Sequence, residues 1–354
     1  MSEVVSTLDE NKLSEYLNGV ELEGANVEAF RGPLSATKFA DGQSNPTFLI
    51  RAQSGIYVLR RQPPGKLLRS AHAVDREFRI LRALSDSDVP VPRVYHLCQD
   101  SSVIGSMFYL MEFVDGRVFW DAALPEAGDN SARAAMYTEM NRVLAAIHQV
   151  DFNAVGLADY GRPGNYFERQ LRRWREQYRL SETRKIVAMN TLIAWLEGHL
   201  PPDDGQVAIV HGDFRFDNVM FHPREARIVA VLDWELSTLG HPFADLAYQC
   251  MQLRLPADTM HSKGLLGIDR AALGIPSEQQ YLADYCRRRG LKSIPHWDFY
   301  LAFSFFRLAA IAQGVAKRAL DGNASSKQAA NVGALVEPLA RQALKTIDSG
   351  DNNA

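Results

Sequence analysis

The chain has 354 residues, of which 46% are hydrophobic and 23% charged, with a formal net charge of −3 at pH 7. These values are ordinary for a globular protein of about two lobes or domains, and the near-neutral charge does not favour nucleic acid or an anionic membrane as a partner. The three cysteines are odd in number and far apart, which excludes a disulfide framework and a C-x-x-C zinc site and favours a reducing compartment.

The N-terminal segment is acidic and lacks the apolar core of a signal peptide. No apolar run approaches the ~20 residues that a membrane-spanning helix needs. We therefore expect a cytoplasmic protein that does not cross a membrane, with its oligomeric state left open.

The first third of the chain is predicted to be rich in β-structure. After a short helix at residues 7–17, with Thr7 as its cap, residues 36–65 read as three strands with a glycine turn and a tight turn at Ser54–Gly55. A helix is expected at 71–84 and two further strands within 89–116. This predicts about five strands and one long helix.

The rest of the chain is predicted to be mostly helical. Amphipathic or apolar patterns indicate helices at 131–150, 165–180, 183–200, 242–253, 277–290 and 296–320. A β island at 206–235 interrupts them. The order predicts an α+β protein with a β-rich N-lobe at 1–114, a hinge near Asp115–Gly116 and a helical C-lobe at 115–354.

The β island carries unusually many side-chain oxygens. Asp213 follows a strand, Asn218 comes five residues later, and Asp233 ends the next long apolar strand. A hairpin that returns the last strand beside the first loop would gather all three. Two carboxylates and an amide oxygen suit Mg²⁺, which shares phosphate oxygens and keeps waters. A carboxylate that is not bound to the metal could accept the proton of a hydroxyl group.

Two other readings of the island are weaker. Its Asp and Asn side chains could satisfy the amides of a tight hairpin. A binuclear metallohydrolase built from His211, Asp213, Asp233 and His241 is conceivable, but it leaves Asn218 unexplained.

The order of these residues resembles the catalytic region of kinases, which reads His-x-Asp, four residues, Asn, and then a second Asp after a strand pair. His211, Asp213, Asn218 and Asp233 match it, and "HGD" is similar to the aminoglycoside phosphotransferase and choline kinase side of that superfamily. With "FYLMEFVDG" and "VLDWELSTLGHPFADLAY", residues 30 to 320 most resemble the phosphotransferase-type domain associated with acyl-CoA dehydrogenase-like proteins. The resemblance implies a bilobal, protein-kinase-like fold.

The resemblance implies roles for the catalytic loop. Asp213 would be the catalytic base, and Arg215 would stabilise charge on the transferring phosphoryl group. Asn218 and Asp233 would hold Mg²⁺, with a weaker metal or water contact from Glu235. Three further side chains would support the loop: His211, Asp217 and Asp245.

The resemblance also implies an ATP site between the lobes. Arg60 stands where the family often has Lys and would pair with Glu77 on the next helix, with Lys66 as a second candidate. The segment "DGQSN" would cover the phosphates through Gly42, Ser44 and Asn45. In "LMEFV", the Glu112 carbonyl and the Val114 amide would bind adenine, and Met111 would line the pocket.

The implied function is ATP- and Mg²⁺-dependent phosphorylation of a small-molecule hydroxyl. The predicted helix at 165–180 holds five arginines, which read either as a solvated face paired with Glu168 and Glu176 or as an anion-binding wall for a CoA ester. Those arginines are Arg169, Arg172, Arg173, Arg175 and Arg179. An aminoglycoside or amino alcohol is the alternative acceptor. A nucleotide-binding scaffold without catalysis is the alternative function, and ATP versus GTP stays open.

Overall fold

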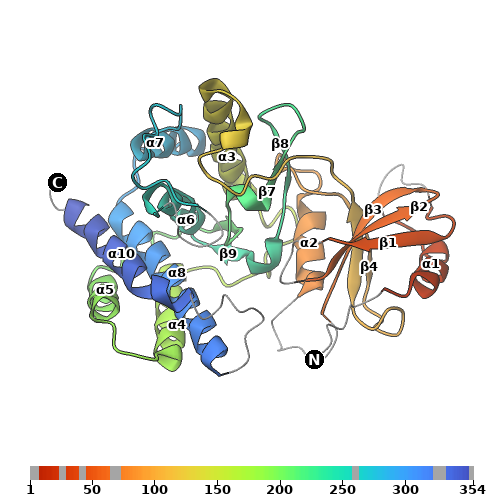
Figure 1. Cartoon of the computed structure of the whole chain (residues 1–354), viewed down its shortest axis with the longest axis horizontal. Coiled ribbons are helices and arrows are strands. Elements are labelled where there is room, and N and C mark those ends of the chain that lie inside the picture. The colour runs from red at the N-terminus through yellow and green to blue at the C-terminus, as the bar shows by residue number, and fades with distance from the viewer. Residues whose placement is uncertain are drawn as a thin grey trace.

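The structure is a computed structural model, and it describes residues 8–23, 29–39, 45–63, 73–256, 263–321 and 332–350. A small β-rich N-lobe and a larger helical C-lobe lie side by side, with helix α2 (Val74–Leu84) between them (Figure 1). The α+β, bilobal architecture predicted from the sequence is confirmed. The exact lobe boundary after residue 114 stays a prediction.

The N-lobe is built on one antiparallel sheet of five strands, as expected. Its spatial order is β1-β2-β3-β5-β4. The strands span Leu34–Lys38 (β1), Thr47–Ala52 (β2), Gly55–Arg61 (β3), Val94–Cys98 (β4) and Phe108–Glu112 (β5). Because alternate residues of a strand face opposite sides, Tyr57 and Leu59 of β3 enter a small outer core with helix α1 (Glu10–Asn18), whereas Val58 packs in the core shared with α2.

The N-lobe contains two described helices, and sequence features explain where α1 begins and which face of α2 is buried. Helix α1 begins after Asp9, whose side chain accepts a hydrogen bond from the Lys12 N–H, so Asp9 is its cap; the predicted cap, Thr7, lies outside the described residues. Helix α2 buries the predicted apolar face, and Glu77 of the same helix is also buried, at 2% exposed. A buried carboxylate needs a charged partner, and the site provides one.

Most of the C-lobe consists of helices close to the predicted ones. They span Asn130–Gln149 (α3), Tyr166–Ser181 (α4), Val187–Gly198 (α5), Phe243–Met251 (α6), Glu278–Arg289 (α7), Trp297–Leu320 (α8) and Val336–Gly350 (α10). Short 3-10 turns lie at Pro125–Ala127, Phe216–Asn218, Trp234–Leu236, Gln252–Arg254 and Gly333–Leu335. Helix α10, which packs on α8 and α5, was not predicted.

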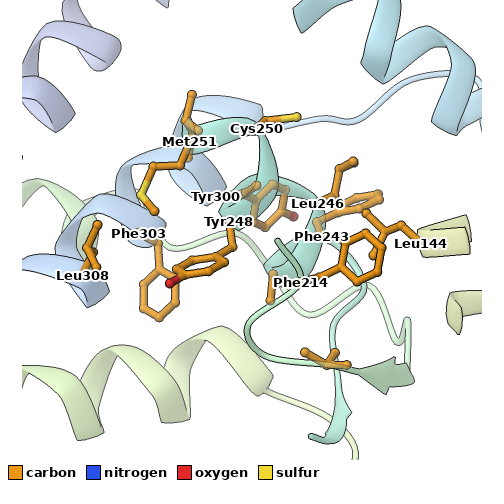
Figure 2. Packing of buried hydrophobic residues seen from close by; sticks show 14 of the residues in the cluster. Leu144, Phe214, Phe243, Leu246, Tyr248, Cys250, Met251, Tyr300, Phe303 and Leu308 are labelled. Atoms are coloured by element: carbon orange, nitrogen blue, oxygen red, sulfur yellow. The ribbon is translucent and has the colours of Figure 1, made fainter. Parts of the chain in front are cut away.

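Helices α8 and α6 form the centre of the C-lobe. Helix α8 is long and apolar enough to span a membrane by length and composition, and 72% of its most apolar window is buried inside the protein. Every residue of α6 is buried. Figure 2 shows Tyr248 of α6 beside Phe303 of α8, while Phe243 and Leu246 lie on the other side toward Leu144. Helices α6 and α8 therefore form a fully packed centre of the C-lobe.

The β island consists of two strand pairs. Strand β6 (Ala208–Val210) pairs with β9 (Thr238–Gly240), and β7 (Val219–Phe221) pairs with β8 (Ile228–Val231), both antiparallel. The hairpin β7–β8 was expected, whereas β9 was not. Together the two pairs hold residues 211–218 and 232–237 side by side.

Candidate active site

The hairpin β7–β8 brings the oxygen-bearing residues together. Val219 faces Val231 in the register, and the Leu232 N–H donates a hydrogen bond to the Asn218 carbonyl at 2.8 Å. Asn218 and Asp233 therefore lie at the same end of the hairpin. Asp233 has φ +62°, in the left-handed region that Asp tolerates better than most residues.

Hydrogen bonds fix the direction of the Asn218 side chain. Its Nδ2 donates to the carbonyl oxygen and to Oδ2 of Asp213, both at 2.8 Å. The amide nitrogen is thus committed to Asp213, which directs Oδ1 of Asn218 away from that carboxylate. The other oxygen of Asp213 lies 3.2 Å from Nε of Arg215, whose Nη2 lies 2.9 Å from Asp217. Burial raises the pKa of Asp217, against the opposing effect of Arg215.

His211 and Asp245 support the loop as predicted. Nδ1 of His211 accepts a hydrogen bond from the Asp213 N–H at 3.2 Å, and Nε2 lies 2.8 Å from the Leu232 carbonyl. The Asp245 carboxylate accepts from the N–H groups of His211 and Gly212 at 2.6 and 2.8 Å. Both ring nitrogens of His211 are therefore used within the loop.

That arrangement argues against a binuclear metal site. His241 is also engaged, with Nε2 3.2 Å from Asp204. In the parts of the chain that the structure describes, no group of three or more His, Cys, Asp or Glu side chains is arranged to hold a metal ion. The metallohydrolase alternative is therefore not supported.

A second layer of buried groups lies behind Asp245. His148 of α3 has Nε2 3.4 Å from the Asp245 carboxylate and Nδ1 2.7 Å from the hydroxyl of Tyr285 on α7. Burial lowers the pKa of His148. Burial alone would raise the pKa of Asp245, but His148, His211 and the hydrogen bond from the Gly212 N–H together outweigh it and the pKa is lowered. Asp245 is thus held as an anion under the loop.

Arg60 joins the two lobes. Its Nε lies 2.9 Å from Glu77, the predicted partner, and its Nη2 lies 2.6 Å from Oδ1 of Asp233 and 3.8 Å from Glu235. Burial raises the pKa of Glu77 to about 7, although the charge of Arg60 opposes it. Burial would lower the pKa of Arg60, but Glu77 and Asp233 raise it. One guanidinium thus faces three carboxylates.

The proposed adenine-binding segment follows β5. Met111 is buried and pairs with Val58 in the sheet. Glu112 uses its N–H and its carboxylate on the backbone of Arg93, at 2.8 and 3.2 Å. Val114 is half-buried, and within the described part of the chain its N–H donates no hydrogen bond. That amide is therefore available for the predicted contact.

The segment predicted to cover the phosphates is described only in part. Asn45 is buried, and its carbonyl accepts a hydrogen bond from the Thr47 hydroxyl at 3.0 Å. Gly42, Ser44 and Lys66 lie outside the described residues. Their predicted contacts with phosphate stay predictions.

Three residues beside the catalytic loop were not predicted. Arg307 of α8 donates to the Gly212 carbonyl at 2.8 Å, and its guanidinium lies over the rings of Tyr248 and Trp174, 5.2 and 5.8 Å from the ring centroids. The Tyr248 hydroxyl faces Asp213; burial and this charge raise the pKa of Tyr248. A lone arginine in the apolar run "FSFFRLAAIA" was the available signal for Arg307.

The arginines of α4 divide into two groups. Arg175 pairs with Glu197, and Arg179 lies 3.4 Å from Glu182. The expected partners, Glu168 and Glu176, were therefore wrong for Arg175 and Arg179. Arg172 and Arg173 are exposed, and Arg173 lies over the Trp174 ring at 5.6 Å.

The residues predicted to hold Mg²⁺ have the chemistry that this ion prefers. Asn218, Asp233 and Glu235 offer only oxygen donors. The amide of Asn218 is oriented so that its nitrogen bonds Asp213, and no described residue donates to its Oδ1. Asp233 is bound by Arg60, so a metal ion would compete with that contact. The donor set fits a single Mg²⁺, and the metal roles stay predictions.

Solved structures define the class of protein to which this arrangement belongs. Aminoglycoside phosphotransferase APH(4)-Ia, in a complex with ADP and hygromycin B, superposes with a TM-score of 0.61 over 96% of this chain and 98% of that chain, at 14% identity. Macrolide 2'-phosphotransferase from Brachybacterium faecium gives a TM-score of 0.57 over 92% and 96% of the two chains, at 19% identity. The chain has the kinase-like fold of these enzymes.

The match to a family model is more specific. Residues 35–302 match the model of the phosphotransferase enzyme family. The chain belongs to that family, whose members are small-molecule kinases. A structure from Ralstonia eutropha, provisionally assigned as an aminoglycoside phosphotransferase, is 48% identical with a TM-score of 0.87 over 97% of this chain and 99% of that chain.

Curated relatives are longer proteins. Acyl-CoA dehydrogenase family member 10 of Mus musculus is 48% identical over 95% of this chain, and probable acyl-CoA dehydrogenase IBR3 of Arabidopsis thaliana is 46% identical over 88%. The chain spans only 31% and 40% of their lengths. It is therefore similar to one part of each.

Proposed function

We propose that the protein transfers the γ-phosphoryl group of ATP, with Mg²⁺, to a hydroxyl group of a small acceptor. The observation that carries this proposal is the convergence of Asp213, Asn218 and Asp233 at one end of a hairpin that faces Arg60. Nucleotide complexes of a structural neighbour support the choice of donor, because APH(4)-Ia was crystallised with ADP and with AMP-PNP.

Asp213 is the residue that acts on the acceptor. Asn218 and Arg215 hold its two oxygens, so the carboxylate is oriented before the acceptor arrives. It accepts the hydroxyl proton as the hydroxyl oxygen forms a bond to the γ-phosphorus, and the bond from that phosphorus to the β,γ-bridging oxygen breaks to leave ADP.

The cations of the site stabilise the phosphates. Mg²⁺, held by Asn218 and Asp233 with Glu235 in support, would neutralise charge on the phosphate oxygens. Arg60 contacts Asp233 directly and donates to phosphate once it leaves that carboxylate. Arg215 lies beside Asp213, where charge develops on the transferred group.

We propose further that the acceptor is a CoA ester. Arg307 and Arg173 both lie over the ring of Trp174, and Arg307 also donates to the Gly212 carbonyl, so a cationic and partly aromatic surface adjoins the loop. Such a wall suits the phosphates and adenine of CoA better than it suits a polycationic amino sugar. The names of the relatives, acyl-CoA dehydrogenases, point in the same direction.

The test is steady-state phosphorylation by Mg·ATP of hydroxyacyl-CoAs, the matching free hydroxy acids, aminoglycosides and amino alcohols. We expect CoA esters to have the highest kcat/KM. Arg173→Gln should raise KM for a CoA ester by about tenfold, the value of one charged hydrogen bond. The control Arg175→Gln removes an arginine already paired with Glu197 and should leave KM unchanged.

The possible outcomes test the acceptor, the phosphoryl transfer and the nucleotide donor separately. Phosphorylation of aminoglycosides but not of CoA esters would reject the acceptor and keep phosphoryl transfer. Mg²⁺-dependent ATP binding with no product from any acceptor would favour the scaffold alternative. No ATP binding would reject the donor as well.

A further inference from the structure

A cavity of about 860 Å³ lies in the C-lobe between α3, α7 and the segment at 268–276. Its lining contains none of the residues assigned above to catalysis, metal or nucleotide binding. It nevertheless touches the catalytic loop through Tyr137, whose ring packs edge-on against Phe216 at 4.9 Å between centroids. Its volume is in the range of pockets that bind small molecules.

One buried side chain in the lining of this cavity has a hydrogen-bond acceptor to which no described residue donates. Asn141 of α3 is 1% exposed, and its Nδ2 donates to the Tyr281 carbonyl at 2.8 Å. Its Oδ1 is buried, and no described residue donates to it. A buried acceptor without a partner costs about 1 to 3 kcal/mol, so a ligand that donates to Asn141 would recover that cost.

The lining of the same cavity also contains an arginine, Arg270, that forms no ion pair with any described residue. Among the described residues no carboxylate lies within 4 Å of the Arg270 guanidinium, and its Nη1 is buried without an acceptor. The two acidic side chains of the lining are already used: Asp284 bonds Arg287 at 2.7 Å, and Asp269 accepts from the Ala272 N–H at 3.1 Å. The lining therefore presents the Arg270 guanidinium without an ion-pair partner among the described residues, next in the chain to Asp269, whose charge the N–H does not neutralise.

We infer that this cavity binds a small organic anion that carries a hydrogen-bond donor next to its anionic group, such as a hydroxycarboxylate. The anionic group binds Arg270, because a guanidinium pairs well with a carboxylate or phosphate. The neighbouring hydroxyl or ammonium donates to Oδ1 of Asn141. Both unpartnered groups are satisfied by one molecule.

The ligand acts on the catalytic loop through the two helices that it joins. From α3, Tyr137 contacts Phe216, three residues after Asp213. From α7, Tyr285 lies one turn after Tyr281 and reaches the loop through His148 and Asp245. A molecule held by Asn141 and Arg270 fills the space between α3 and α7 and therefore restrains the loop from two sides, which makes the cavity an effector site.

The first experiment measures binding without any kinase reaction, so its result does not depend on the proposed function. Lactate, malate and glycerate are titrated against the whole protein, with saturation-transfer NMR as the readout. We expect at least one to bind with a Kd of about 1 mM or below, in the range of a weak small-ligand contact. Arg270→Gln should weaken binding about tenfold or more, and the control Arg318→Gln, an exposed arginine of α8, should not.

The second experiment measures coupling and guards against a misfolded variant. The bound probe should slow hydrogen–deuterium exchange of residues 211–221 in the wild-type protein. Ala134→Phe, which fills the cavity from α3, should abolish both binding and this protection. Failure of all three probes to bind, or equal binding to the Arg270→Gln or Ala134→Phe variant, overturns the site. Binding without slower exchange at 211–221 overturns the effector role.

Discussion

Arg60 and Asp233 are 173 positions apart in the chain, and the Arg60 guanidinium donates to the Asp233 carboxylate at 2.6 Å. The same side chain pairs with Glu77, so a strand of the N-lobe, a helix of the N-lobe and the catalytic hairpin meet at one cation. A guanidinium can make both contacts because its nitrogens point in different directions. A lysine would have to make both contacts from a single nitrogen, whereas Arg60 makes them from Nε and Nη2.

This dual contact predicts different outcomes for two substitutions of Arg60. Arg60→Met leaves Glu77 buried without a cation and should lower the free energy of unfolding by about 3 kcal/mol. Arg60→Lys keeps a charge near Glu77 and should cost clearly less. Urea unfolding measures both, with Arg79→Met as the control, since its ion pair with Asp159 is largely exposed and contributes under about 1 kcal/mol. Equal losses for Met and Lys would contradict the proposed role of the Glu77 pair.

Asp213→Asn tests the base. The amide cannot accept the hydroxyl proton, so kcat should fall by about 10² to 10⁴. Nucleotide affinity should stay the same, because Asp213 is assigned to the acceptor and the amide oxygen of the substituted residue can still accept the hydrogen bond from Asn218. Single-turnover kinetics and calorimetry measure the two quantities, and full activity would rule out Asp213 as the base.

Asp233→Asn tests the metal ligand. Loss of one carboxylate charge should weaken Mg·ATP binding by about tenfold or more, while binding of ATP without Mg²⁺ should not weaken, because Arg60 is freed from Asp233. Calorimetric titrations with and without Mg²⁺ give both affinities. The same loss of affinity in both titrations would show that Asp233 does not act through a metal.

His148 should make stability depend on pH. Burial lowers its pKa from the usual 6.5 in the folded protein. The unfolded chain therefore binds this proton first as the pH falls. The stabilisation is complete above pH 6.5 and is lost as the pH falls toward the folded pKa, with a slope of at most about 1.4 kcal/mol per pH unit.

The variant that checks this is His148→Gln, which lacks the titrating ring. Its free energy of unfolding, measured by urea between pH 5 and 7.5, should fall less steeply with acid than that of the wild-type protein. Exposed His199→Gln is the matched control and should keep the wild-type slope. An unchanged slope in His148→Gln would mean that another group carries the acid sensitivity.

Gly116→Ala tests the close approach of the interlobe connection to the hairpin. A Cβ at Gly116 would lie 2.3 Å from Cγ of Met220 and 2.6 Å from the carbonyl oxygen of Phe221. We expect a loss of about 1 to 3 kcal/mol in urea unfolding, the usual cost of overpacking. Gly198→Ala, where the added Cβ meets nothing within 4 Å, is the control and should not destabilise the protein. Equal effects of the two substitutions would contradict the contact.

The local part of the site could be predicted because its residues are close in the chain. Asp213, Asn218 and Asp233 fall within 21 positions, and an alternating apolar pattern with a turn between β7 and β8 brings their ends together. The pairing of Arg60 with Glu77 was also predicted, from the family motif. The phosphate-covering positions Gly42 and Ser44 are not described by the structure, so that prediction remains to be tested.

Contacts between distant segments were decided by tertiary packing. No local pattern shows that Arg307 of α8 reaches Gly212, that β9 pairs with β6, or that Arg60 reaches across to Asp233. The sequence by itself determined the order of the elements and the chemical type of the catalytic side chains, because strand and helix periodicity and turn residues act over a few positions. Only the tertiary structure decided which distant charges meet, because that depends on how α6 and α8 pack in the C-lobe and how the N-lobe lies beside the hairpin.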